Sequence, residues 1–195
     1  MFVRSAVLAL VLAAACFSLA AAQQTLPIEP RPDLGLTLQD LPPGFGILPA
    51  VPDATGPIAA ASRGYARADA AEGPSLVATV TLGTYDPHVA SLLVPALARV
   101  FVSSPAVPGM QESGGSEWVE WEPVDAVGLG DQAIMYHFRV EAAERDPRAD
   151  GGLAVFRRHE LVGAVLVINE HGQGLASVRE YASLIDDRMK RALGP

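Results

Sequence analysis

The feature that most constrains the fold is a pair of apolar segments near the C-terminus that a tight polar turn separates. The segments span residues 153–157 and 160–169, and the turn is expected at Arg158 and His159. Two short apolar runs that flank a tight turn are typical of a β-hairpin. The chain is therefore expected to contain antiparallel strands close to its C-terminal end.

Four further segments have the composition of strands, and they span residues 64–68, 76–82, 116–122 and 132–141. The first two are expected to form an antiparallel pair. In the last one, the alternation of side chains predicts a half-buried strand. One of its faces is apolar, with Ile134, Tyr136, Phe138 and Val140, and the other carries Met135, His137 and Arg139. A polar loop is expected over residues 142–152, before the hairpin.

Two amphipathic helices are expected. Asp86 and Pro87 start the first, because a carboxylate can accept a hydrogen bond from a free first-turn N–H and proline is tolerated at the first helical position. This helix is predicted to reach about Val102 and to be kinked or split at Pro95. The second is predicted from one apolar stripe, formed by Val178, Tyr181, Ala182, Ile185, Met189 and Leu193. The order of strands, helix, strands, helix predicts an α+β fold, an antiparallel sheet with two main amphipathic helices packed on it.

The first 22 residues are typical of a signal peptide. Arg4 precedes an apolar run over residues 6–17, and three alanines at 20–22 form a cleavable site. We expect cleavage after Ala22 and a secreted or periplasmic protein. Residues 23–57 are rich in proline and are expected to form an extended leader without helix. Residues 58–195 are expected to form one α+β globular domain.

Within the leader, residues 36–38 are expected to form a short strand. Leu41 and Phe45 flank a Pro-Pro-Gly turn. Apolar residues that flank a turn commonly anchor it to a core, so both side chains are expected to plug the edge of the core.

Cys16 offers an alternative to cleavage after Ala22. Residues 12–16 loosely resemble a bacterial lipobox, in which the cysteine becomes the lipidated first residue of the mature protein. Apolar sequence continues past Cys16 to the alanines, which favours the signal-peptide interpretation. In both cases the folded domain is without a disulfide, because Cys16 is the only cysteine of the chain.

The charge of the chain limits its partners. It has 14 basic and 22 acidic residues and a net charge of -8. Nucleic acid and anionic lipid both require a basic patch, so neither is expected as a partner. No second apolar run of spanning length follows the signal segment, so no transmembrane segment is expected in the mature chain.

Three short motifs carry a resemblance to known proteins. They lie at residues 41–45 (Leu-Pro-Pro-Gly-Phe), at 130–133 (Gly-Asp-Gln-Ala) and at 155–158 (Val-Phe-Arg-Arg). Through them, residues 34–193 resemble exported bacterial domains of uncharacterised function. More loosely, they resemble the PsbP/Mog1-like α/β sandwich, a fold shared by photosystem accessory, GTPase-binding and secreted mycobacterial proteins of the lipoprotein type. This chain has His159 and Glu160 where that pattern has Gly-Asn at the hairpin turn. The resemblance implies an accessory or binding role and carries over no catalytic residue.

The metal motifs of the chain are incomplete. His159 and Glu160 begin a zinc-protease motif, but Gly163 stands where its second histidine is required. His171 with Glu170 and His137 would form a loose metal site, although isolated histidines at strand ends are usually solvated. We therefore assign no residue to a metal.

The catalytic motifs fail in the same way. Residues 128–130 (Gly-Leu-Gly) lack the third glycine and the helix of a dinucleotide site, and the chain has no Gly-x-Ser-x-Gly elbow. The carboxylates of Glu117, Glu120, Glu122 and Asp125 could act as the acid and base of a glycosidase, yet a solvated strand edge explains them more simply. We assign no catalytic or cofactor-binding residue and expect no cofactor.

Two classes of function remain. The favoured one is an exported, non-catalytic accessory or binding module for a protein, a polymer or an apolar ligand. Its candidate contacts are Met110, in a Pro/Gly/Ser-rich loop over residues 103–117, and Trp118 and Glu120 in the strand that follows. Alternation in that strand buries Trp121 and leaves Trp118 partly exposed, and exposed aromatic residues beside loops are good contact anchors.

The alternative is an extracytoplasmic hydrolase that uses His137 or His171 with the acidic strand at residues 117–125. A pocket that unites a histidine with two carboxylates would favour this hydrolase. A sheet covered by both helices and without a cleft would favour the binding module.

Overall fold

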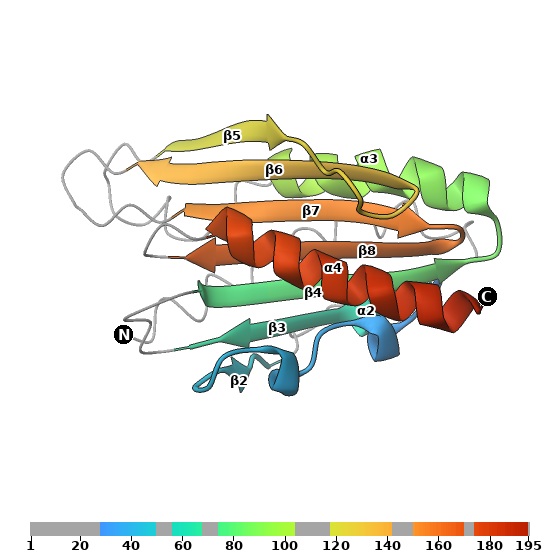
Figure 1. Ribbon diagram of the computed structural model, residues 1–195, viewed down its shortest axis with the longest axis horizontal. Helices are drawn as coiled ribbons and strands as arrows, with labels where there is room; N and C mark the ends of the chain where they lie inside the picture. The colour runs from blue at the N-terminus through green and yellow to red at the C-terminus, as the bar shows by residue number, and fades with distance from the viewer. Residues whose placement is uncertain are drawn as a thin grey trace.

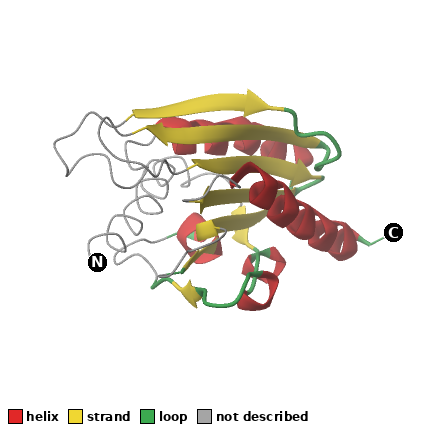
Figure 2. Cartoon of the chain, turned by 60° about the vertical axis from the view of Figure 1, so that its left-hand side comes forward, coloured by secondary structure: helices red, strands yellow, loops and turns green. Residues whose placement is uncertain are grey.

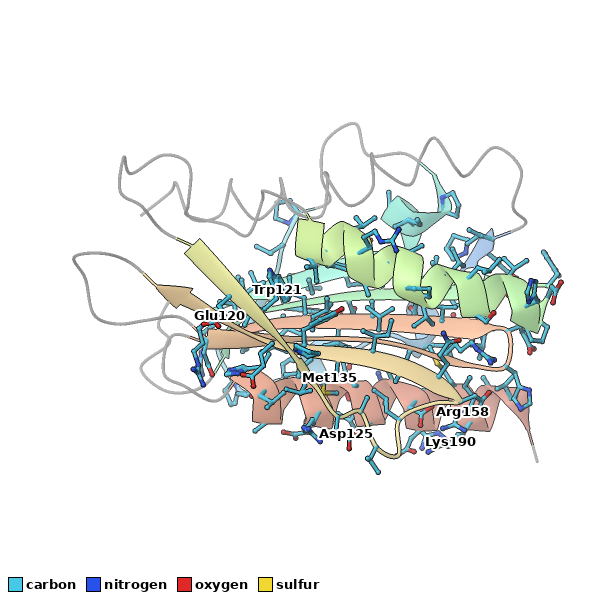
Figure 3. The ribbon with its side chains drawn as sticks, turned by 90° about the horizontal axis from the view of Figure 1, so that it is seen from above. Glu120, Trp121, Asp125, Met135, Arg158 and Lys190 are labelled. Atoms are coloured by element: carbon cyan, nitrogen blue, oxygen red, sulfur yellow. The ribbon has the colours of Figure 1, made fainter. Side chains whose placement is uncertain are left out.

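The computed structural model describes residues 28–49, 56–67, 74–103, 118–141, 150–169 and 174–194. In this part of the chain an eight-stranded antiparallel sheet lies between two long helices, one on each face (Figures 1 and 3). The predicted α+β class, with an antiparallel sheet and two main helices packed on it, is confirmed.

The strands of the described part follow the order β2-β3-β4-β8-β7-β6-β5 across the sheet, and β1 pairs with the end of β4 that β3 leaves free. Their bounds are β1 (Ile28–Pro30), β2 (Gly46–Ile47), β3 (Ser62–Ala66), β4 (Pro74–Thr84), β5 (Trp118–Val124), β6 (Gln132–Glu141), β7 (Asp150–Arg158) and β8 (Leu161–Asn169). The helices are η1 (Pro32–Leu34), η2 (Leu38–Asp40), α2 (Pro57–Ala61), α3 (Pro87–Ser103) and α4 (Gly174–Leu193), where η1 and η2 are 3-10 turns. The central strand of this order is therefore β8, flanked by β4 and β7, and β5 lies at one edge.

The core has two layers because helices cover both faces of the sheet. Leu153 and Val155 of β7 pack on the α3 side, and Ala154 and Phe156 pack on the α4 side. Continuous apolar sequence in β7 and β8 thus reflects burial on both faces. Burial on the α4 side reaches β6 only at Met135, whereas Arg139 farther along the same face is exposed, so β6 is half-buried as predicted over this part of the strand.

Helix α3 begins as predicted, with the carboxylate of Asp86 accepting a hydrogen bond of 2.8 Å from the N–H of His88. The helix is continuous across Pro95. Proline has no N–H for the carbonyl four residues earlier. That carbonyl, on Ser91, instead accepts a hydrogen bond of 3.4 Å from the Gln132 side chain of β6.

Helix α4 buries its predicted apolar stripe, except for a partly exposed Leu193. Its first turn approaches β7 closely where that strand has glycines. A Cβ on Gly152 would collide with Val178, and one on Gly174 would lie 2.5 Å from the Cα of Gly151. Residues 150–152 were expected in a loop but belong to β7. Gly151 and Gly152 of this strand, with Gly174, permit the close contact between helix and strand.

The segment 28–49 takes part in the sheet and the core. Strand β1 pairs with β4, and Leu34, Leu36 and Leu41 are buried against the α4 side of the sheet, with Phe45 partly buried there. Figures 1 and 2 show this segment at the β2–β3 side of the sheet, away from β5. The prediction that Leu41 and Phe45 plug the core is confirmed.

The predicted strand at residues 36–38 is wrong, and so is the exclusion of helix, because η1 and η2 form in this segment. Thr37 extends the backbone just before η2, and the carboxylate of Asp40 accepts hydrogen bonds from its N–H and its hydroxyl, at 2.7 and 2.8 Å. Asp40 also receives two hydrogen bonds from Arg188 of α4, at 2.7 and 2.8 Å. Local capping and this distant arginine together favour the turn over a strand.

The hairpin of β7 and β8 is confirmed, but its turn is one residue later than expected, at His159 and Glu160. His159 has a φ of 52°, in the left-handed region that a non-glycine residue rarely adopts. Its N–H donates to the carboxylate of Asp131 at 2.7 Å, which holds the turn in place.

Candidate functional site

The part of the sheet that carries exposed charge is the α4 side of β5 and β6. Helix α4 packs on β7 and β8, so the outer two strands keep a charged face that is open to solvent. Four side chains there line a shallow hollow of about 40 Å³, namely Glu120 and Glu122 of β5 and His137 and Arg139 of β6. We call these four residues the β5–β6 surface.

The register of the two strands brings these side chains together. Glu120 lies directly opposite Arg139, and Glu122 lies directly opposite His137. Residues opposite one another in an antiparallel pair point to the same face of the sheet. Because both pairs lie two residues apart, all four side chains share the α4 side.

His137 is held in place from the neighbouring strand. Its Nε2 lies 3.2 Å from Oδ2 of Asp150, and the side chains of both residues are mostly buried. The other carboxylate oxygen of Asp150 accepts a hydrogen bond of 3.1 Å from the N–H of Gly174, the first residue of α4. A carboxylate is favoured at a helix N-terminus, where N–H groups are free. Asp150 thereby ties the start of α4 to the histidine of the surface.

Charge alternates from strand to strand across this side of the sheet. Asp150 lies on β7, His137 and Arg139 lie on β6, and Glu120 and Glu122 lie on β5. Opposite charges on neighbouring strands stabilise a sheet modestly, whereas like charges directly opposite destabilise it. The alternation ends with an acidic column on β5, whose outer side faces no described strand.

The chemistry available at the β5–β6 surface is limited by what lines it. A histidine oriented by a carboxylate is the arrangement of a general base. However, none of the four lining side chains is a serine, threonine, cysteine or lysine that such a base could activate. In the part of the chain that the structure describes, no group of three or more His, Cys, Asp or Glu side chains is placed to hold a metal ion.

The structure places some of the predicted contact residues and leaves others outside its description. Glu120 is exposed within the β5–β6 surface, and Trp118 begins β5 opposite Glu141, with its side chain outside the described part. Met110, Glu117 and His171 lie outside the described residues, as do residues 1–22. Asp125 lies beyond the end of β5, where its carbonyl accepts a hydrogen bond from Arg179 of α4. Of the predicted acidic group, the structure thus brings Glu120 and Glu122 to the hollow.

Trp121 points to the other face of β5, toward the α3 side (Figure 3). Its ring lies 4.7 Å from that of Phe138 and 6.0 Å from that of Tyr136, measured between centroids. The indole packs against the core but remains only partly buried, because β5 is the last strand of the described sheet.

Sequence reasoning missed two members of this region. Arg139 was placed on the same strand face as His137 but received no role, since a single arginine on a strand carries no motif. Asp150 falls within the polar loop expected over residues 142–152, whereas it begins β7. Its contact with His137 depends on the pairing of β6 with β7, which no short sequence pattern encodes.

A second ionic cluster, at the β7–β8 turn, is structural. Arg158 donates two hydrogen bonds of 2.7 Å to Asp186, which is 2% exposed, and a third of 3.2 Å to Asp131. Lys190 lies 3.0 Å from the same Asp186 carboxylate, and Figure 3 shows Arg158 and Lys190 close together beside α4. Burial alone would raise the pKa of Asp186, but hydrogen bonds from Arg158 and Lys190 outweigh it and lower that pKa. The cluster is satisfied internally and joins the hairpin to α4.

The fold and the surface define an α+β protein with an antiparallel sheet between two helices and one charged, uncovered sheet edge. Neither a family model nor a curated protein matches this chain. Among the helices that the structure describes, none combines the length and the apolar character that crossing a membrane requires.

Proposed function

We propose that this protein is an exported, non-catalytic accessory module that binds a partner protein through the β5–β6 surface. The observation that carries the proposal is the charged hollow formed by Glu120, Glu122, His137 and Arg139 on the part of the sheet that α4 leaves open. The register of β5 with β6 gathers these four side chains at one place on the open face of the sheet.

The shape of the surface favours a macromolecular partner. Small-molecule sites are concave and bury most of the ligand. The hollow is shallow, and Glu120, Glu122 and Arg139 around it are exposed. The net charge of -8 disfavours nucleic acid. A protein that contacts the outer strands fits both properties.

The resemblance to PsbP/Mog1-like domains remains part of the proposal. It rests on the three short motifs at residues 41–45, 130–133 and 155–158. The accessory or binding role that the likeness implies agrees with an open charged surface without a nucleophile.

Export after cleavage at Ala22 also belongs to the proposal and rests on Arg4, the apolar run and the three alanines. Intact mass of the protein from the envelope or the culture supernatant tests it. A mature form that begins at Gln23 is expected. A form that begins at Cys16 with acyl chains would instead make the protein membrane-anchored.

Chemical cross-linking in the producing cell tests the binding surface. The wild-type protein is compared with a double variant, Glu120→Arg with Glu122→Arg, and with Glu29→Arg. Glu29 is exposed on β1, which pairs with β4 and lies away from β5. The Glu29→Arg variant therefore controls for a reversed charge on a strand outside the proposed surface. We expect the double variant to lose cross-linked partners that Glu29→Arg retains. An identical set of partners in all three proteins would refute the proposed surface.

A second candidate is the hydrolase. It is favoured by the contact of His137 with Asp150, whose other carboxylate oxygen accepts a hydrogen bond from the N–H of Gly174. The hollow also unites this histidine with two carboxylates. Purified protein is assayed with chromogenic ester, amide and glycoside substrates, together with His137→Gln. Turnover that His137→Gln abolishes, with the fold unchanged by circular dichroism, would establish the hydrolase over the binding module. Equal background rates for both proteins would exclude it for these substrate classes.

A further inference from the structure

Strand β5 ends the described sheet, and its outer edge pairs with no described strand. Its pairing with β6 runs without a break from Trp118 to Val124. Pro123 lies within this run and has no N–H to donate. An unbroken ladder therefore requires that Pro123 and its partner Tyr136 form a non-hydrogen-bonded pair.

The position of Pro123 sets the direction of the other backbone groups. Hydrogen-bonded and non-hydrogen-bonded pairs alternate along an antiparallel ladder. Val119 and Trp121 thus belong to the same class as Pro123, and their N–H and C=O groups point away from β6. This edge of β5 pairs with no strand among the described residues, and it presents two N–H donors and three carbonyl acceptors to an added strand.

The charges on the α4 side indicate which strand would fit there. Asp150 on β7 lies opposite Arg139 on β6, and Arg139 lies opposite Glu120 on β5, with Glu122 two residues along the same strand. Both glutamates are exposed. A strand added outside β5 would continue the alternation if its side chains on this face were basic.

The α3 side of β5 has a different character. Trp121 is partly buried on Phe138, and Pro123 is exposed. An added strand would lie beside these two residues and would cover more of the indole with apolar side chains. Since the two faces of a strand alternate residue by residue, the matching sequence alternates basic and apolar residues.

A second copy of this chain is the wrong occupant. Two β5 strands paired edge to edge would place the columns of Glu120 and Glu122 beside each other. Like charges on adjacent strands are destabilising, and charged residues with a proline are the features by which edge strands avoid self-association. The net charge of -8 adds repulsion between copies.

We propose that the free edge of β5 binds, by strand addition, an extended segment of a partner protein in which Lys or Arg alternates with apolar residues. This inference rests on the proposed function, since it names the mode and the chemistry of binding at the same surface. Main-chain hydrogen bonds supply the pairing, and the alternating side chains supply the specificity.

Four synthetic peptides test the proposal against the full protein by isothermal titration calorimetry. The first is acetyl-Lys-Val-Lys-Val-Lys-Val-Lys-amide, and the second has Glu in place of every Lys. The third and fourth keep the first sequence but are N-methylated at alternate residues, the third along one edge of the peptide and the fourth along the other. We expect the lysine peptide to bind, the glutamate peptide to bind at least about tenfold more weakly, and one of the N-methylated forms to lose binding by a similar factor.

Protein variants complete the test. Glu120→Lys with Glu122→Lys should reverse the preference to the glutamate peptide. Val119→Pro removes an outward N–H without breaking the ladder with β6, and it should weaken binding of the lysine peptide, whereas Val119→Thr should not. Protection of the Trp121 amide from hydrogen exchange on adding the lysine peptide gives a readout at the edge itself.

Several outcomes would overturn strand addition. Equal binding of the lysine peptide and its N-methylated forms would mean electrostatic adhesion without pairing. Concentration-dependent dimerisation that Val119→Pro abolishes would make a second copy the occupant. If the glutamate variants lose their cross-linked partners in the cell while no peptide binds at the edge, the proposed surface stands and the strand-addition mode is wrong.

Discussion

Removing the charge of Asp186 should be costly, because this carboxylate is buried and receives most of the hydrogen bonds of its cluster. Asp186→Asn keeps the shape of the side chain but leaves Arg158 with Asp131, at 3.2 Å, as its remaining acidic partner. Two charge-assisted hydrogen bonds of 2.7 Å are weakened at a residue that is 2% exposed. Hydrogen bonds to charged groups contribute about 1.5 to 3 kcal/mol, and breaking a buried pair costs about 3 to 5 kcal/mol. Since Arg158 is partly exposed and keeps Asp131, we expect a loss of about 2 to 4 kcal/mol.

Asp187→Asn is the matched control. The Asp187 side chain is 57% exposed and pairs with Lys190 at 3.0 Å, so its change should stay within about 0.5 kcal/mol. Urea unfolding at neutral pH measures both variants, with the midpoint interpreted only if the slope is unchanged. Equal small losses in the two variants would refute the reasoning that burial makes the Asp186 pair important.

The pH dependence of stability gives a second readout. The pKa of Asp186 is lowered in the folded protein, so its contribution is present above the unfolded pKa of about 3.9 and is lost as the pH falls through the folded pKa. The difference in unfolding free energy between wild type and Asp186→Asn should therefore shrink below about pH 4. A difference that is constant down to about pH 2 would contradict the assignment.

Three further changes test the packing. Thr79→Val should be neutral or stabilise by up to about 1 kcal/mol in urea unfolding, because the buried Thr79 hydroxyl has no hydrogen-bond partner among the described residues. Thr81→Val should instead cost about 1 kcal/mol, because the Thr81 hydroxyl donates to a backbone carbonyl at 2.5 Å. Gly151→Ala should cost about 3 kcal/mol or prevent folding, since its Cβ would collide with the Phe138 ring and lie 2.5 Å from a backbone oxygen, and circular dichroism with thermal unfolding shows either result. His159→Gly should raise the melting temperature, with about 1 kcal/mol of stabilisation, because the residue has a φ of 52° that glycine adopts without strain, and an unchanged or lower melting temperature would contradict this.

The sequence predicts which side chains of the candidate site share a strand face, but not which strands become neighbours. Glu120, Glu122 and His137 were recognised as polar residues on strands, because alternation over a few residues reveals which side chains share a face. Which histidine would meet which carboxylate was left open. That depended on the antiparallel register of β5 with β6 and of β6 with β7, which joins segments across loops and cannot be derived from either segment alone.

The sequence by itself determined the elements whose cause is local. Patterns within a short stretch of sequence predict three such elements. They are the start of α3 at Asp86 and Pro87, the apolar stripe of α4 and the hairpin of β7 and β8. Their backbone preferences and apolar spacing act before any distant contact forms. The same patterns predicted the α+β class.

Tertiary structure alone decided the features that join distant residues. Asp40 and Arg188 are 148 positions apart, and their contact holds the 3-10 turn at Leu38–Asp40 against α4. Helices on both faces buried Met135 as well as Phe138, and the order of strands left β5 at the edge with its acidic column uncovered. These outcomes depend on which strands become neighbours. That choice is a property of how the whole core packs, because the cost of closing long loops is offset only when many distant contacts form together.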